Sequence, residues 1–124
     1  MKLTEAFDEN VYIVDSYTEH SVTINGRDFS RSTAVSANNL IENWVDDAIH
    51  VDTLLIEHFE KLFEIQPEVI ILSTGDKTQF PPIELRAAIM KRNIGLEVMD
   101  TGAACRTYNV LLAEGRRVLL AILL

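Results

Sequence analysis

The second half of the chain alternates between short apolar runs and helical patterns, and this alternation restricts the possible folds most. Residues 69–73 form an apolar run suited to a buried strand, and residues 117–124 form another, RVLLAILL. Between them the sequence predicts a helix over about 82–92, a short strand over 96–99 and a helix over about 102–114. Strand, helix, strand, helix and strand in this order predict an α/β layer on a partly parallel sheet. The uninterrupted apolar final strand is typical of a strand buried on both faces, so we expect it at the centre of the sheet.

The first third of the chain has the composition of β-structure. VYIVDSYT (11–18) and SVTIN (21–25) are rich in β-branched and aromatic residues, and Asn25-Gly26 is a strong hairpin signal. A less regular passage follows and contains Trp44, which we expect, with Phe80, to anchor loops against the core. A helix is then predicted over about 52–63, capped by Asp52 and followed by Pro67.

These patterns describe one domain over residues 1–124. It comprises a β-rich part (1–45), the helix of about 52–63 and an α/β half (68–124). The longest apolar run, 118–124, is too short to span a bilayer, so no membrane insertion is expected. The start of the chain has no apolar or Arg-rich leader pattern, which makes a cytoplasmic location the default expectation.

The charge of the chain is strongly uneven. The net charge is −8, with 4 basic and 14 acidic residues in 1–70 but 7 basic and 5 acidic residues in 71–124. An acidic chain of this kind is not expected to bind nucleic acid, because phosphate neutralisation needs a basic face. One cysteine and three scattered histidines predict no structural zinc site and no internal disulfide.

The loops that follow strands 69–73 and 96–99 form the candidate pocket. If these strands are parallel neighbours, both loops emerge at the same edge of the sheet, where ligands of open α/β sheets bind. The predicted pocket residues are Thr74, Gly75, Asp76, Lys77, Asp100, Thr101, Gly102, Cys105 and Arg106. Neither loop has the spacing of a phosphate-binding P-loop or a dinucleotide fingerprint, so no cofactor is predicted.

Cys105 allows two interpretations. A thiol near a helix amino terminus meets free backbone N–H groups and the positive end of the helix dipole, which lower its pKa and favour reactivity. By helical spacing, however, Cys105 lies about 60° from the centre of its helix's apolar face, where a small side chain can simply pack. His58 lies in the apolar stripe of the 52–63 segment, where we expect a partly buried histidine with its hydrogen bonds satisfied.

The motif GLEVMDTGAACRTYNVLLAEGRRVLLAIL (95–123), with the earlier NGRDFSRS and Trp44, resembles a small single-domain family of unknown function. That family includes the mitochondrial complex I assembly factor three and an adipogenesis-associated domain protein, and its fold is the Mth-type α/β domain. The resemblance implies a three-layer fold with a mixed central sheet, whose last strand is central and antiparallel to its neighbours. It implies no established catalytic activity, and the assembly role of one relative suggests a binding role. Relatives commonly have Gly-Thr-Gly in the first loop, where this chain has Ser73-Thr74-Gly75, so a phosphate-cradling role is less favoured.

Two functional hypotheses follow. The first is a non-enzymatic protein-interaction or assembly-factor-like module with an unidentified protein partner. The second is a small-molecule-binding or enzymatic site at the loop edge around Cys105. Homo-oligomerisation through the hairpin region or an exposed sheet edge is a further possibility, because edge strands are usually protected or paired.

Overall fold

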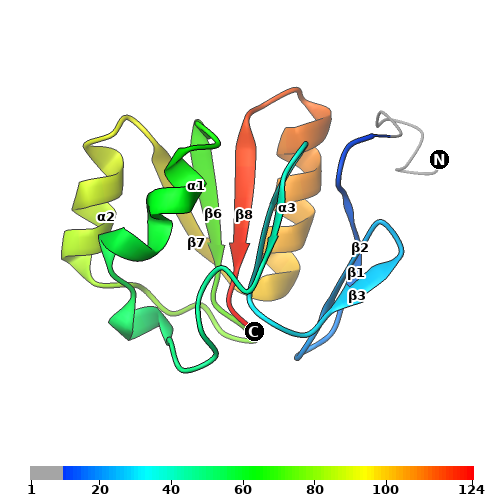
Figure 1. Ribbon diagram of the computed structural model, residues 1–124, viewed down its shortest axis with the longest axis horizontal. Coiled ribbons are helices and arrows are strands. Elements are labelled where there is room, and N and C mark those ends of the chain that lie inside the picture. The colour runs from blue at the N-terminus through cyan, green and yellow to red at the C-terminus, as the bar shows by residue number, and fades with distance from the viewer. Residues whose placement is uncertain (1–9) are drawn as a thin grey trace.

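A computed structural model describes residues 10–124, and its central feature is a mixed five-stranded sheet with helices on both faces (Figure 1). The strand order is β5-β4-β8-β6-β7, and a separate antiparallel sheet contains β1-β2-β3. The predicted α/β class with a mixed central sheet is therefore confirmed. Residues 1–9 of the predicted β-rich part lie outside the described residues.

The elements occur in the predicted order, and the boundaries of the second half agree with the prediction to within two residues. The first part contains β1 (Val14–Tyr17), β2 (Val22–Ile24), β3 (Arg27–Phe29), β4 (Thr33–Ser36) and β5 (Leu40–Glu42). The connection contains the 3-10 helices η2 (Val51–Thr53) and η3 (Ile56–Phe59) and the short helix α1 (Glu60–Phe63). The second half contains β6 (Val69–Ser73), α2 (Ile83–Met90), β7 (Gly95–Met99), α3 (Thr101–Ala113) and β8 (Val118–Ile122).

Strand β8 lies at the centre of the sheet, as its apolar sequence predicts, and its five residues are buried. The implied antiparallel pairing with both neighbours is wrong. β8 is antiparallel to β4 but parallel to β6, with Val69 opposite Val118 and Ser73 opposite Ile122. The chain connects β6, β7 and β8 through α2 and α3, and such helical crossovers return it to the same end of the sheet, so these strands run parallel.

The two faces of the sheet form two separate cores. Ile70 and Leu72 of β6 face the layer made by η2, η3, α1 and α2. Val69 and Ile71 face α3, on whose other side the three-stranded sheet packs with the buried Val22, Ile24 and Phe29. Figure 1 shows α3 between β8 and the sheet β1-β2-β3. The three-stranded sheet β1-β2-β3 thus forms an additional layer that covers α3.

The predicted continuous helix over 52–63 is wrong. Leu54 and Leu55 have extended backbones that separate η2 from η3, and only residues 60–63 are α-helical. The Nδ1 atom of His58 accepts a hydrogen bond from the Leu55 N–H at 2.9 Å, so a side chain replaces the helical backbone acceptor there. Both leucines fit the apolar spacing of a helix, but only Leu54 is buried in the core, whereas Leu55 is 52% exposed. Half-buried His58 has the satisfied hydrogen bond expected of it.

The two predicted aromatic anchors differ. Trp44 packs edge-on against Phe59 with 5.3 Å between ring centroids, and its indole N–H donates to the Ile122 carbonyl at 2.9 Å. Phe80 is 68% exposed, so its prediction as an anchor is wrong. The apolar residues of this segment that are buried are instead Pro81 and Leu85.

Candidate functional site

The loops after β6 and β7 meet at the carboxyl ends of these strands, but they are bonded directly to each other. The N–H of Thr74 donates to the Met99 carbonyl at 2.9 Å, and the N–H of Thr101 donates to the Gly75 carbonyl at 2.8 Å. The buried Ser73 hydroxyl donates to the Thr101 hydroxyl at 3.1 Å. These bonds close much of the crevice in which an open α/β sheet would hold a ligand.

The amino terminus of α3 is also largely satisfied from within the chain. Asp100 is its N-cap, and its Oδ1 accepts from the Ala103 N–H at 2.9 Å. The N–H of Ala104 donates to the Asp100 carbonyl, while that of Thr101 is bonded to Gly75. Two of the N–H groups that a helix start leaves free, those of Thr101 and Ala103, therefore have partners, which weakens this terminus as an anion-binding site.

Cys105 is packed in the core rather than presented at this edge. Its side chain is 3% exposed and lies in the cluster between α3 and the sheets, with Ala104 and Tyr108. Burial raises the pKa of the Cys105 thiol to about 12, and the charge of Arg106 lowers it only in part. The reactive interpretation requires a lowered pKa, so the burial of the thiol and its raised pKa favour the packed interpretation.

Seven of the nine predicted pocket residues line two adjoining shallow hollows. One hollow of about 250 Å³ is lined by Tyr17, Thr18, Glu19, Gly75, Asp76, Asp100, Thr101, Gly102 and Arg106. A neighbouring hollow of about 330 Å³ adds Thr74, His20, Asp47, His50 and Gln79, among others, and shares Glu19, Gly75 and Asp76. Lys77 and Cys105 line neither hollow. Ligand binding at this edge stays a prediction.

Tyr17 is the residue of this edge that sequence reasoning missed. A Cβ placed on Gly102 would lie 2.6 Å from the Tyr17 hydroxyl, so the ring rests directly on the first turn of α3. The same hydroxyl accepts from Nη1 of Arg106 at 3.3 Å. This contact depends on how the hairpin sheet packs on α3, for which the sequence around Tyr17 carries no local signal.

Further along α3, polar side chains hold the hairpin sheet in place. The Asn109 amide accepts from the Val14 N–H at 3.1 Å and donates to the Val14 carbonyl at 2.9 Å. The buried Tyr108 hydroxyl donates to the Tyr12 carbonyl at 2.8 Å. Since these groups are bonded within the fold, they act as structural links between α3 and β1.

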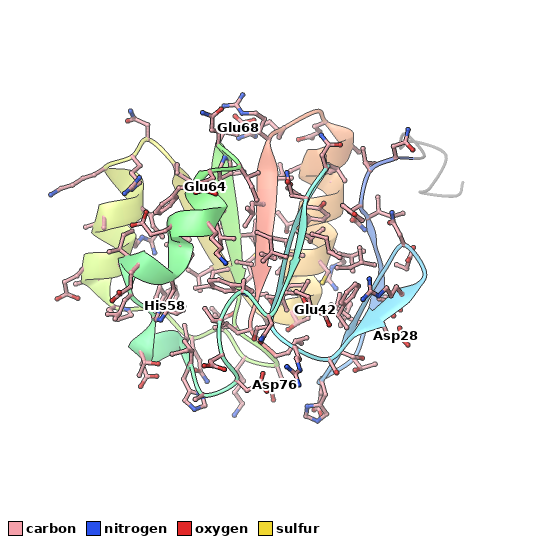
Figure 2. The ribbon with its side chains drawn as sticks, in the orientation of Figure 1. Asp28, Glu42, His58, Glu64, Glu68 and Asp76 are labelled. Atoms are coloured by element: carbon pink, nitrogen blue, oxygen red, sulfur yellow. The ribbon has the colours of Figure 1, made fainter. Side chains whose placement is uncertain are left out.

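At the loop edge, Asp76, Lys77 and Arg106 are exposed, Asp100 is half-buried, and the hydroxyl groups of Ser73 and Thr101 are buried. Figure 2 shows Asp76 at this end of the sheet, with Glu68 at the opposite end. Within residues 10–124, no three side chains of His, Cys, Asp or Glu are grouped so as to hold a metal ion. No helix in this described part of the chain is long and apolar enough to cross a membrane.

Comparison with known sequences finds relatives over most of the chain. A family model described as "Protein of unknown function (DUF498/DUF598)" matches residues 14–123. The "13 kDa major membrane protein" of Francisella tularensis subsp. holarctica is 28% identical over 102 residues, which are 82% of each chain. The NADH dehydrogenase [ubiquinone] 1 alpha subcomplex assembly factor 3 of Rattus norvegicus is 33% identical over 116 residues. That match covers 92% of this chain and 60% of the rat protein, so the chain spans less than two thirds of the assembly factor's length.

Solved structures show the same fold. The protein XCC1710 of Xanthomonas campestris superposes with a TM-score of 0.82 at 34% identity, covering 94% of this chain and 89% of that one. A Bordetella pertussis protein described as a Mth938-like domain has a TM-score of 0.79 at 24% identity, covering 99% of this chain and 92% of its own. These matches confirm the resemblance drawn from the 95–123 motif and the Mth-type fold that it implies.

Proposed function

Since the chain belongs to the DUF498/DUF598 family of proteins of unknown function, we propose that it is a non-enzymatic protein-interaction module that assists the assembly of a larger complex. The kinship with the assembly factors, at 33% identity to the rat protein, supports this role. The loop edge, where backbone groups bond to each other, also supports it, as does the burial of the Cys105 thiol in the core with a raised pKa. These features oppose nucleophilic catalysis by the thiolate.

The observation that carries the proposal is a second apolar face on α2. Leu85 and Ile89 bury one side of this helix, but Ile83 is 76% exposed and Met90 is 55% exposed. With the exposed Ala87 they recur at i, i+4 and i+7, so they form one stripe on the outer side. Phe80, which precedes the helix by three residues, is also apolar and exposed. We call Phe80, Ile83, Ala87 and Met90 the α2 surface, and Figure 1 shows α2 at the end of the molecule opposite the three-stranded sheet.

The charge around the α2 surface indicates the kind of partner. Residues 77–92 contain four basic side chains and one acid, a net charge of +3 in a chain whose total is −8. Arg86 and Lys91 are exposed and, by helical spacing, lie on opposite flanks of the stripe. A two-fold pairing of two α2 helices would bring together two surfaces of net positive charge, which is unfavourable. The surface therefore fits a different protein that presents apolar residues framed by carboxylates.

Site-directed photo-crosslinking tests this proposal. A photoreactive phenylalanine analogue replaces Ile83 in one variant and Val110 in a matched control, because Val110 is a similarly sized apolar residue that is exposed on α3 (56% exposed). In the native host, we expect position 83 and not position 110 to cross-link to a protein. The cross-linked peptide should carry apolar residues beside Asp or Glu, and cross-linking should weaken as salt is raised.

Paired surface variants complete the test. The double substitution Ile83→Ser and Met90→Ser should abolish recovery of that partner, whereas Val110→Ser should not. Cross-links only to a second copy of the chain, only to lipid, or equally at both positions would each contradict the proposal. The proposal also includes a cytoplasmic location, which cell fractionation tests; recovery of the protein in the membrane fraction would contradict that part.

A further inference from the structure

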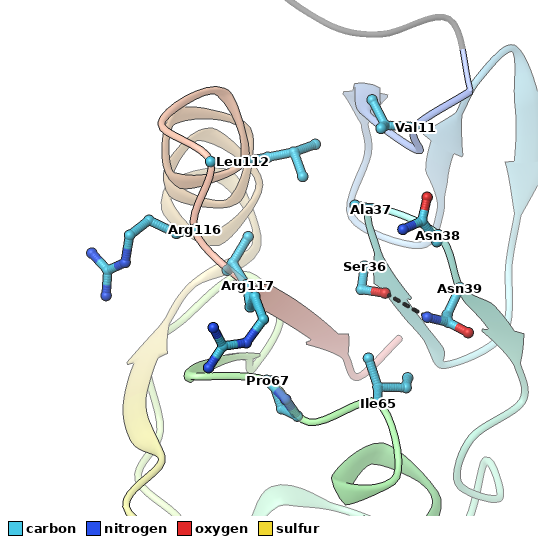
Figure 3. A pocket seen from close by; sticks show the side chains of 12 residues that line it. Val11, Ser36, Ala37, Asn38, Asn39, Ile65, Pro67, Leu112, Arg116 and Arg117 are labelled. Atoms are coloured by element: carbon cyan, nitrogen blue, oxygen red, sulfur yellow. Dashed lines mark hydrogen bonds between the residues drawn. The ribbon is translucent and has the colours of Figure 1, made fainter.

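A further pocket lies at the end of the central strands opposite the loops around Thr74 and Asp100. It includes no residue of the predicted site or of the α2 surface. It has a volume of about 380 Å³ and opens where β6 and β8 begin, beside the carboxyl end of α3. Figure 3 shows Arg117 on one side of it and Ser36, Asn38 and Asn39 on the other. A pocket of this size is within the range that proteins use for small-molecule ligands.

The body of the pocket is apolar. Its walls come from four separated segments, so only the folded chain creates it; the apolar side chains are Val11, Ala37, Ile65, Pro67, Leu112 and Val118. A ring or a branched hydrocarbon placed there would leave water for an apolar surface, which is favourable in proportion to the area buried.

The polar groups of the pocket select for negative charge. Among its twelve described lining residues none is acidic, and the two charged ones are Arg116 and Arg117. The Arg116 Nε is paired with Glu68 at 3.2 Å, and the same carboxylate accepts from the backbone N–H of Arg117 at 2.8 Å. Arg117 donates from Nε to the Gln66 carbonyl at 3.2 Å, which fixes its planar group. Within residues 10–124 its two terminal nitrogens have no hydrogen-bond acceptor, so both can bond to a ligand, while its charge also acts on the nearby Glu68 carboxylate and helps to lower the pKa of that group.

The far wall adds hydrogen-bond donors. The buried Ser36 hydroxyl accepts from the Asn39 amide at 3.2 Å, which leaves its own proton free to be donated. The exposed Asn38 amide lies beside it on the β4–β5 turn. A carboxylate or sulfonate accepts hydrogen bonds only, and a guanidinium binds such groups in a planar, two-point geometry.

We propose that this pocket binds a small organic anion with an apolar body of one or two rings, with Arg117 holding the acid group and Val11, Ile65 and Leu112 contacting the body. The site is independent of the protein-interaction role, since it shares no residue with the α2 surface.

The test uses 1-naphthoate and its uncharged analogue 1-naphthamide in amide chemical-shift titrations of the whole protein. Naphthoate should shift the signals of residues 36–39, Leu112 and Arg117, without shifting those of 100–106. Naphthamide should bind about tenfold more weakly, because it lacks the charge-assisted hydrogen bonds. Arg117→Gln should weaken naphthoate binding about tenfold and leave naphthamide unchanged, a split that a merely structural role of Arg117 would not produce.

Two further variants keep the test decisive. Ala37→Leu should fill the pocket and abolish binding of both probes with Arg117 intact, and Arg106→Gln, at the other edge, should change neither affinity. Equal binding of the acid and the amide, shifts confined to 100–106, or no saturable shift with naphthoate would overturn the proposal.

Discussion

The burial of Cys105 predicts a specific loss of stability at high pH. Its pKa is about 12 in the folded protein, compared with an ordinary value of 9.0. The folded state therefore retains the thiol proton more strongly than the unfolded state. The stabilisation is fully present below pH 9 and is lost as the pH rises from about 9 towards 12, by about 1.4 kcal/mol for each pH unit.

Urea unfolding of the intact protein and of Cys105→Ala at pH 8 and pH 10.5 measures this effect. At pH 8 the variant should be less stable by about 1–2 kcal/mol, since it loses a buried sulfur atom. From pH 8 to pH 10.5 the free energy of unfolding of the intact protein should fall by about 2 kcal/mol more than that of the variant. The difference builds up over the one and a half pH units above the ordinary thiol pKa of 9.0. Tyr108, whose pKa burial also raises, is present in both proteins, so its contribution cancels in the comparison.

Alkylation provides an independent readout of the same burial. In the folded protein at pH 8, iodoacetamide should modify Cys105 only through unfolding, so the rate should rise with urea in parallel with the unfolded fraction. Two results would refute the reasoning: a stability gap that is constant within about 0.5 kcal/mol between the two pH values, or labelling of the folded protein as fast as that of the unfolded chain. The first result would show that burial does not raise the pKa of the thiol, and the second that the fold does not shield it.

Three substitutions test the contacts that hold the layers together. Asn109→Ala should lower the free energy of unfolding by about 2 kcal/mol in urea titrations, because both of its bonds to Val14 are lost; an unchanged midpoint would contradict this. Gly102→Ala should displace the Tyr17 ring at a net cost below about 1 kcal/mol, since that side chain is 44% exposed and can move. NMR should show altered Tyr17 ring shifts, and unaltered shifts would disprove the contact. Trp44→Phe should cost about 1 kcal/mol in thermal unfolding through the lost indole bond to β8; equal or higher stability would show that this bond contributes nothing.

The parts of the fold that were predictable are those that depend on local patterns. The strand–helix alternation after residue 68 gave the α/β class, because each strand and helix has its own spacing and stop residues. Gly115, for example, has φ of +80° just after α3, a backbone conformation that favours glycine and that commonly ends a helix. The apolar run 118–122 gave the central position of β8, since only a central strand is buried on both faces.

The errors occur where tertiary contacts outweigh local spacing. Leu54 and Leu55 have helical spacing, but their backbones are extended because Leu54 is buried and the His58 side chain satisfies the Leu55 N–H. At the candidate site, the strand pattern predicted that the loops around Thr74 and Asp100 lie at the same end of the sheet, and they follow the parallel neighbours β6 and β7. It could not reveal that these loops bond to each other, or that Tyr17 from a distant strand covers Gly102.

The position of β8 determines the order in which this sheet can be completed during synthesis. Its neighbours β4 and β6 leave the ribosome earlier, yet each needs β8 for a full set of backbone partners, and β8 is the last of the described strands to emerge. Until then the nascent chain carries two incomplete strand edges and two exposed apolar faces. The five-stranded sheet is therefore completed in a late step, in which β8 joins the β4-β5 hairpin to the β6-α2-β7 unit. Premature termination before residue 118 would leave two halves without their shared strand, a form suited to capture by chaperones and proteases.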